Sequence, residues 1–102
     1  AWQREFLMRM QEEFQARQDH VRLARVSDQL AGQSDSFTPV YAAARGFAQA
    51  AVLAPPGDER QKYDERCKEL IARLLQFGEE AGDRIRQDPA FSRYSSLSTT
   101  TR

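Results

Sequence analysis

The sequence predicts an all-α protein: a three-helix up-down-up bundle in which two long outer helices enclose a short Ala-rich middle helix, with coiled-coil-like packing. Apolar residues recur at three- and four-residue steps in the segments near 2–31, 39–53 and 58–87. Runs that alternate at period two in a β-branched context are absent, so no strand competes with these helices. Short connections between three such helices favour an antiparallel bundle.

The first expected helix spans residues 2–31, a segment without Pro or Gly. Its N-terminal half carries large side chains at spacings that gather them on one side of a helix, namely Trp2, Phe6, Leu7, Met10 and Phe14. Its C-terminal half carries smaller aliphatic residues. Gly32 is a natural stop signal, and the polar run 33–36 predicts a loop.

The middle helix begins where Thr38 can act as N-cap and Pro39 can occupy the first helical position. Its many alanines allow helix axes to approach closely, so we expect this helix to be the most enclosed of the three. Gly46 costs about 1 kcal/mol of helix propensity relative to Ala, which indicates that another backbone passes nearby. The sequence Ala-Pro-Pro-Gly at 54–57 ends the helix.

The third helix, 58–87, begins at Asp58 and carries a heptad seam. The seam steps alternately by four and three through Tyr63, Cys67, Leu70, Leu74, Phe77 and Ala81, and Ile85 extends the same face. Gly78 weakens the far end, and Asp88-Pro89 closes the helix. Its path stays open, because this helix can also swing away and pair with another chain.

Residues 1–90 form the predicted helical bundle, and 91–102 form a Ser/Thr-rich tail that is partly docked or disordered. Phe91, Tyr94 and Leu97 at three-residue spacing allow the tail to dock as a last helical turn. Arg93 lies three residues before Ser96, which makes Ser96 a candidate phosphorylation site. Because the chain begins at Ala1 rather than Met, we expect a processed protein or a piece of a larger one.

The unequal helix lengths lead to a prediction about partners. At about 1.5 Å per residue the outer helices reach about 45 Å and the middle helix about 22 Å, so the middle helix leaves apolar surface uncovered. A protein partner or a second copy is expected to cover it. The predicted partner-binding residues are Trp2, Phe6, Leu7, Met10 and Phe14 at one end and Phe77, Ala81 and Ile85 at the other.

Composition and charge narrow the classes of function. Fifteen Lys and Arg balance fifteen Asp and Glu, so a dedicated binder of nucleic acid or of an anionic membrane is not expected. No apolar run approaches the roughly 20 residues that span a bilayer. The first residues lack the pattern of a signal peptide, and one cysteine provides no disulfide framework. We therefore expect an intracellular, reducing compartment, with the cytoplasm favoured.

Few residues are candidates for a catalytic or metal-binding role. His20 is the only histidine and is expected to be a solvated surface residue, while Cys67 lies on the seam, where a thiol acts as a small buried hydrophobe. Adjacent carboxylates such as Glu12 and Glu13 point about 100° apart on a helix and do not converge on one ion. Phosphate-binding glycine loops are absent. We expect no enzyme activity, no cofactor, no metal and no small-molecule substrate.

The sequence therefore favours a non-enzymatic helical protein–protein interaction module: a scaffold, dimerisation or adaptor domain of a larger assembly. One alternative is a small helical chaperone or escort that shields an amphipathic helix of a client protein. A less favoured alternative is a nucleic-acid-binding helical domain, because Arg17, His20, Arg22 and Arg25 cluster within nine residues. Acidic residues within and beside this cluster weaken that alternative.

Overall fold

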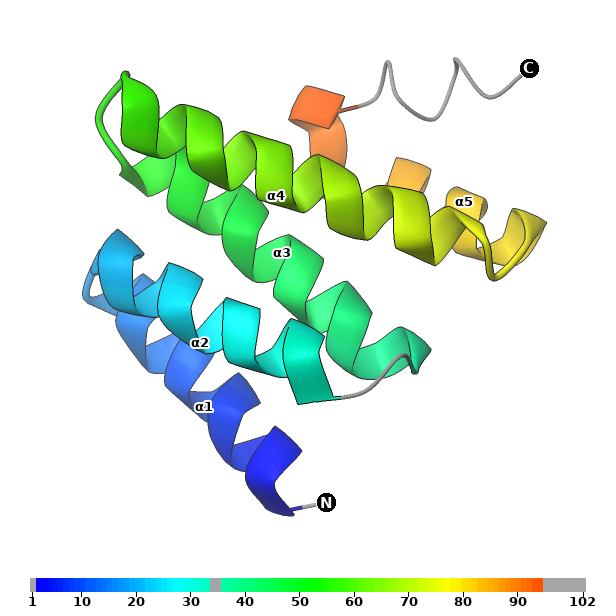
Figure 1. The fold of residues 1–102 in the computed structure, drawn as a ribbon, viewed down its shortest axis with the longest axis horizontal. Helices are drawn as coiled ribbons and strands as arrows, with labels where there is room; N and C mark the ends of the chain where they lie inside the picture. Colours follow the sequence, from blue (N-terminus) through cyan, green and yellow to red (C-terminus); the bar gives the residue numbers. More distant parts are fainter. Residues whose placement is uncertain (1, 34–35, 95–102) are drawn as a thin grey trace.

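A computed structural model describes residues 2–33 and 36–94, and within them all regular structure is helical (Figure 1). The elements are α1 (Trp2–Ala16), α2 (His20–Gln33), α3 (Phe37–Leu53), α4 (Asp58–Leu75), α5 (Glu79–Gln87) and a 3-10 helix, η1 (Pro89–Tyr94). The all-α prediction is confirmed. The prediction of three helices is wrong, because each of the two expected long helices is divided by a turn.

The first turn lies at residues 17–19 and ends α1 with a Schellman motif. Gln18 has a left-handed backbone (φ +60°), the Asp19 N–H donates to the Phe14 carbonyl at 2.9 Å, and the Gln18 N–H donates to the Gln15 carbonyl at 3.0 Å. Asp19 then starts α2, because its Oδ1 accepts a 3.2 Å bond from the Arg22 N–H. Three residues therefore reverse the chain without Gly or Pro.

The second turn lies between α4 and α5. The N–H groups of Gln76, Phe77 and Gly78 donate to carbonyls three residues back, at 3.0–3.2 Å, which tightens the end of α4. Gly78 has φ +117°, a backbone conformation that side-chain-bearing residues rarely adopt. The chain consequently changes direction within the segment that the heptad pattern marks as one helix.

The four long helices alternate in direction, and each packs beside the one before it (Figure 1). They form a slab of 37 × 35 × 19 Å, with α3 between α2 and α4. Ten of the 17 residues of α3 are buried, against five of the 18 residues of α4, so the Ala-rich helix is the most enclosed, as predicted. The segment α5–η1 folds back onto α3 and places Phe91 and Tyr94 in the core.

The close approach at Gly46 involves side chains rather than another backbone. Gln11 Nε2 donates to Ser27 Oγ at 2.9 Å and to the Ala42 carbonyl at 3.0 Å, and Ser27 Oγ donates to the Leu23 carbonyl at 2.8 Å. A Cβ at position 46 would fall on Ser27 Oγ and lie 2.5 Å from Gln11 Nε2. Gly46 therefore makes room for a satisfied polar junction of α1, α2 and α3.

The two turns also remove the predicted length mismatch. The helices α1 to α4 contain 15, 14, 17 and 18 residues, so the middle helix is as long as its neighbours. The argument for apolar overhangs at both ends is therefore wrong. Phe14, Ala81 and Ile85 are buried by the chain's own core, which corrects the expectation that they lie on an uncovered face.

Candidate partner-binding groove

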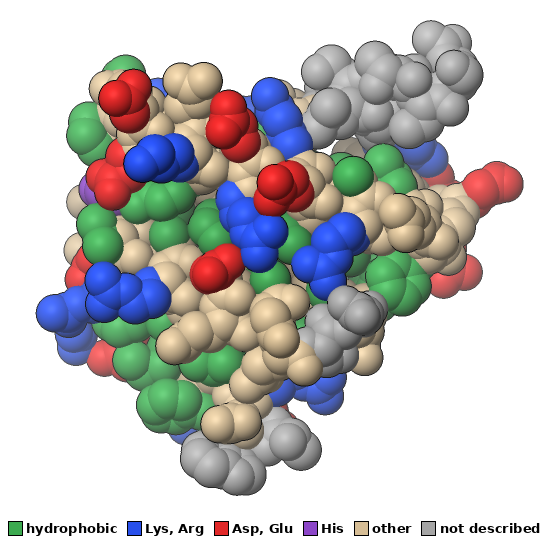
Figure 2. All heavy atoms as spheres, viewed as in Figure 1, with side chains coloured by type: hydrophobic (Ala, Val, Ile, Leu, Met, Phe, Trp, Pro, Cys, Tyr) green, Lys and Arg blue, Asp and Glu red, His purple; other side chains and the backbone are tan. Residues whose placement is uncertain are grey.

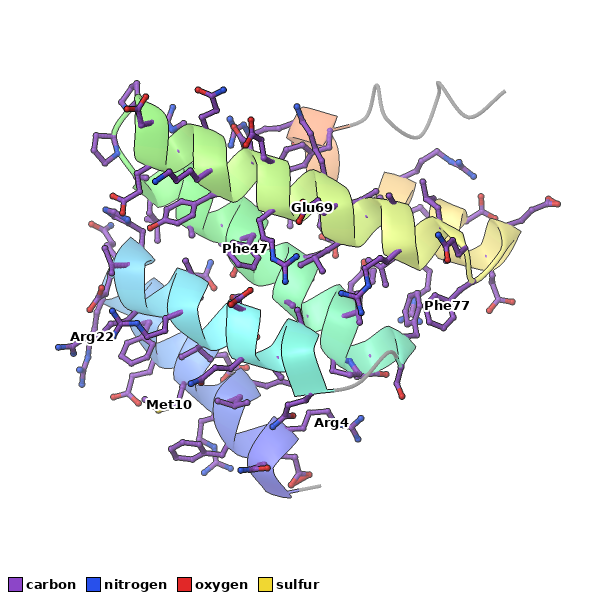
Figure 3. The ribbon with its side chains drawn as sticks, in the orientation of Figure 1. Arg4, Met10, Arg22, Phe47, Glu69 and Phe77 are labelled. Atoms are coloured by element: carbon purple, nitrogen blue, oxygen red, sulfur yellow. The ribbon has the colours of Figure 1, made fainter. Side chains whose placement is uncertain are left out.

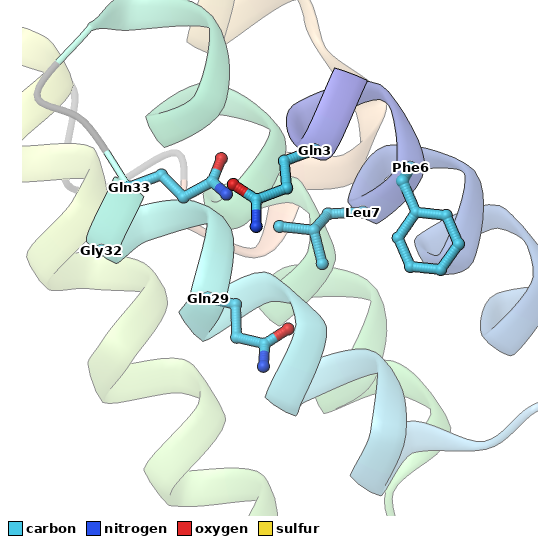
Figure 4. A pocket seen from close by; sticks show the side chains of 6 residues that line it. All are labelled: Gln3, Phe6, Leu7, Gln29, Gly32 and Gln33. Atoms are coloured by element: carbon cyan, nitrogen blue, oxygen red, sulfur yellow. The ribbon is translucent and has the colours of Figure 1, made fainter. Parts of the chain in front are cut away.

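A groove of about 640 Å³ lies between the first two turns of α1 and the end of α2 (Figure 4). Its lining residues are Gln3, Phe6 and Leu7 from α1 and Gln29, Gly32 and Gln33 from α2. The hairpin turn at 17–19 creates this groove, because it brings the N-terminus of α1 beside the C-terminus of α2. In Figure 4 the three glutamine side chains lie around Leu7, while Phe6 lies on the outer side of α1.

The six described residues that line this groove are apolar or neutral polar residues. Phe6 is 53% exposed, which is unusual for a phenylalanine, and Leu7 is half-buried. The three carboxamides can each donate and accept hydrogen bonds, so they can pair with polar groups at the edge of a bound segment. Among the described residues of the lining, none is an acid, a base, a nucleophile or a metal ligand. These described residues are suited to binding an apolar segment.

The structure places the predicted partner-binding residues in different environments. Phe6 and Leu7 line the groove, and Met10 is half-buried against the core. Phe77 is 50% exposed at the turn between α4 and α5, where its ring meets Phe37 edge-on at 5.5 Å. Met10 and Phe77 thus lie at opposite ends of the molecule (Figure 3). The Trp2 side chain and Ser96 lie outside the described part of the structure.

The three glutamines of the groove are not among the partner-binding residues that the sequence predicts. Gln3 is one turn before Leu7, and Gln29 and Gln33 are one turn apart at the end of α2. Helical spacing therefore relates them to one another within each helix. The spacing does not show that α1 folds back onto α2. Gln3 comes close to Gln29 and Gln33 only because of the turn at 17–19.

Cys67 has the environment that its seam position predicts. It is fully buried, and its thiol donates to the Ala44 carbonyl at 3.3 Å. Burial raises the pKa of the Cys67 thiol to about 12, so the nucleophilic thiolate is scarce at neutral pH. Cys67 is a packing residue between α3 and α4.

His20 is not the solvated surface residue that its polar neighbours predict. Its side chain is partly buried, with Nδ1 3.2 Å from the Tyr63 hydroxyl and 3.9 Å from a Glu59 carboxylate oxygen. Burial, together with the nearby Glu59 carboxylate, raises the pKa of Tyr63 to about 12. The tyrosine therefore stays neutral, and the His20–Tyr63 contact connects the start of α2 to α4.

Charged side chains of both signs are interspersed over α2 and α4 on the face in Figure 2. Arg66 on α4 pairs with Asp28 on α2 at 3.0 Å and with Glu69 at 2.9 Å. Among residues 2–33 and 36–94, no group of three or more His, Cys, Asp or Glu residues is placed to hold a metal ion. Within the same ranges, no helix has the length and apolar character needed to cross a bilayer.

Comparison of the chain with protein-family models, curated protein sequences and solved structures finds no match.

Proposed function

We propose that this chain is a non-enzymatic helical protein–protein interaction module, a scaffold, dimerisation or adaptor domain, that binds a partner in the groove of Phe6 and Leu7. The observation that carries the proposal is a half-exposed phenylalanine beside an uncharged groove large enough for several apolar side chains. Fully burying a side chain of that size contributes roughly 1.5–3 kcal/mol, and about half of the Phe6 side chain is still exposed in the isolated chain.

An amphipathic helix is the partner element that fits best. The groove runs between two neighbouring helices, and a third helix can place its apolar face against Phe6 and Leu7. The carboxamides of Gln3, Gln29 and Gln33 can then bond polar side chains on the flanks of that helix. The uncharged lining favours apolar and neutral polar contacts over ion pairs.

Replacement of Phe6 by alanine tests the proposal. Wild type, Phe6→Ala and Val21→Ala are immobilised in parallel, and proteins captured from a cell extract are identified by mass spectrometry. Val21 is a matched control, because it is also exposed but lies on α2 outside the groove. We expect Phe6→Ala to lose its captured partners, with affinity lower by about tenfold or more, while Val21→Ala keeps them.

Thermal unfolding accompanies the capture experiment. Because Phe6 is half-exposed, its truncation is expected to change the free energy of unfolding by less than about 0.5 kcal/mol. Equal capture by all three proteins, or no specific capture by wild type, contradicts the proposal. If partners are found, slow dissociation indicates a permanent assembly, whereas rapid release of unrelated clients indicates the chaperone alternative.

A further inference from the structure

The turn at residues 76–78 is close to a continuous helix. Gln76 is already in the right-handed helical region, Phe77 has negative φ, and Gly78 alone in this turn has positive φ. The next helical bond is present, because the Gly82 N–H donates to the Gly78 carbonyl at 3.4 Å. Rotation at Gly78, with a change from i→i−3 to i→i−4 bonds at residues 76–78, would therefore join α4 and α5 into one helix.

Joining the two helices would provide acceptors for backbone N–H groups at the start of α5. The first N–H groups of a helix have no partner within it, and in a continuous helix those of Glu79, Glu80 and Ala81 would donate to the carbonyls of Leu75, Gln76 and Phe77. The heptad seam of the sequence also runs through this turn, from Leu70 and Leu74 to Phe77 and Ala81. In the structure Phe77 is the half-exposed member of that seam.

The segment beyond the turn, residues 79–94, is here named the closing segment. Asp88 anchors its middle, because its carboxylate accepts from the Tyr41 hydroxyl at 2.7 Å and pairs with Arg45 Nε at 3.0 Å. The ring of Phe91 meets the ring of Tyr41 edge-on at 5.6 Å. These contacts hold the closing segment against α3.

The end of the closing segment is anchored on α4. The Tyr94 hydroxyl donates to the Asp64 carboxylate, and Arg93 pairs with the same carboxylate at 3.1 Å. Phe91 and Tyr94 are both buried. All of these partners lie before the turn, so the closing segment and the surface that receives it are separate parts of one chain.

We propose that two copies of this chain exchange their closing segments. In each copy α4 and α5 merge across Gln76–Gly78, and the closing segment packs on α3 and α4 of the other copy. A second copy is the partner that the observations favour, because it offers the same Tyr41, Arg45 and Asp64 anchors that the closing segment already uses. The exchange does not involve the groove at Phe6, so it stands or fails separately from the proposed function.

Replacement of Gly78 by alanine tests the hinge. Alanine is strained at φ +117° in the closed chain and favours the continuous helix, so the dimer dissociation constant is expected to fall by about tenfold or more. Light scattering coupled to size-exclusion chromatography measures the mass over a concentration series. Gly57→Ala is the matched control, because Gly57 also has positive φ (+146°) and open space around it but lies in the connection before α4, outside both the turn and the groove.

A charge-reversal pair tests whether the dimer is exchanged. Asp64→Lys and Arg93→Asp each replace the attraction between positions 64 and 93 with a repulsion inside a closed monomer. In an exchanged heterodimer of the two variants, one copy of this contact is native and the other is reversed but still attractive. On mixing, we therefore expect the heterodimer to be more abundant than the homodimer of either variant. Native mass spectrometry with one variant isotopically labelled measures these abundances.

The two experiments decide the proposal together. A dimer favoured by Gly78→Ala and a heterodimer favoured on mixing support exchange. A Gly78→Ala protein that stays monomeric, or mixed variants that show no preference for each other, overturns it. If Gly78→Ala fails to fold, the charge-reversal pair still decides, because the side chains of Arg93 and Asp64 both reach solvent, at 38% and 20% exposed.

Discussion

The turn between α1 and α2 and the turn between α4 and α5 both reverse the chain within three residues, but they are held differently. The first is closed by two Schellman bonds and by the Asp19 side-chain cap, and the hairpin it makes contains the buried Gln11–Ser27 bond. The second combines tightened bonds at the end of α4 with the left-handed Gly78. One turn is therefore part of a packed junction, and the other has the properties of a hinge.

The difference extends to what each turn positions. The first turn aligns α1 with α2 along their length and forms the groove of Phe6 and Leu7 at the far end. The second turn directs the nine-residue helix α5 back toward α3. Contacts of Asp88, Arg93 and Tyr94, which follow α5, hold this part of the chain against α3 and α4. Binding at the first region needs a rigid surface, and exchange at the second needs a segment that can leave.

The largest expected effect comes from disturbing the rigid region at Gly46. In Gly46→Ala the added methyl group falls on Ser27 Oγ and crowds Gln11 Nε2, so we expect the free energy of unfolding to decrease by about 2–3 kcal/mol. Urea denaturation followed by circular dichroism measures this change.

A second substitution separates the clash from a general intolerance of alanine. Ser27→Ala combined with Gly46→Ala removes the hydroxyl that the new methyl group meets, so the double variant is expected to lose less stability than the sum of the two single losses. Additive losses would mean that the polar junction is not what restricts position 46.

The helical class and most helix ends follow from sequence signals that act locally. The proline-rich connection before Asp58, the apolar spacing along α3 and the seam of α4 depend on residues close in the chain. The turn at 17–19 lacks such a signal, because glutamine rarely occupies a left-handed position and its cost of about 1 kcal/mol is compensated by contacts distant in sequence. Gly78 is a visible signal, but a seam that continues through it favours an uninterrupted helix.

In the candidate site too, local sequence signals predict which residues are apolar, whereas distant contacts decide which of them stay exposed. Phe6 and Leu7 are recognisable in the sequence because large apolar residues at helical spacing must be covered by something. Phe14 has the same spacing and is covered by the chain itself. Which members of a stripe stay exposed depends on where the chain reverses, so exposure could not be predicted without the turn at 17–19.

The cap at Asp19 gives the next effect in size. Asp19→Ala removes the Oδ1 acceptor of the Arg22 N–H, and we expect the free energy of unfolding to decrease by about 1 kcal/mol. The matched control is Glu12→Ala, an exposed acidic residue inside α1, for which we expect a change below about 0.5 kcal/mol. Equal losses in the two variants would assign the effect to charge rather than to capping.

The smallest expected effect is an increase in the free energy of unfolding. It tests whether packing holds Gln18 in a left-handed conformation that glutamine disfavours. Gln18→Gly removes the cost of a left-handed side-chain-bearing residue, about 1 kcal/mol, which stabilises the folded state. Glycine also increases the conformational entropy of the unfolded chain, which destabilises the folded state by roughly half of that amount. We expect a net increase of about 0.5 kcal/mol in the free energy of unfolding. Gln15→Gly makes the same substitution three residues earlier inside α1, where it should decrease that free energy by about 1 kcal/mol. Opposite signs for the two variants would show that the backbone at position 18 is set by the packing of α1 on α2, whereas a loss in both would mean that position 18 adopts an ordinary helical conformation.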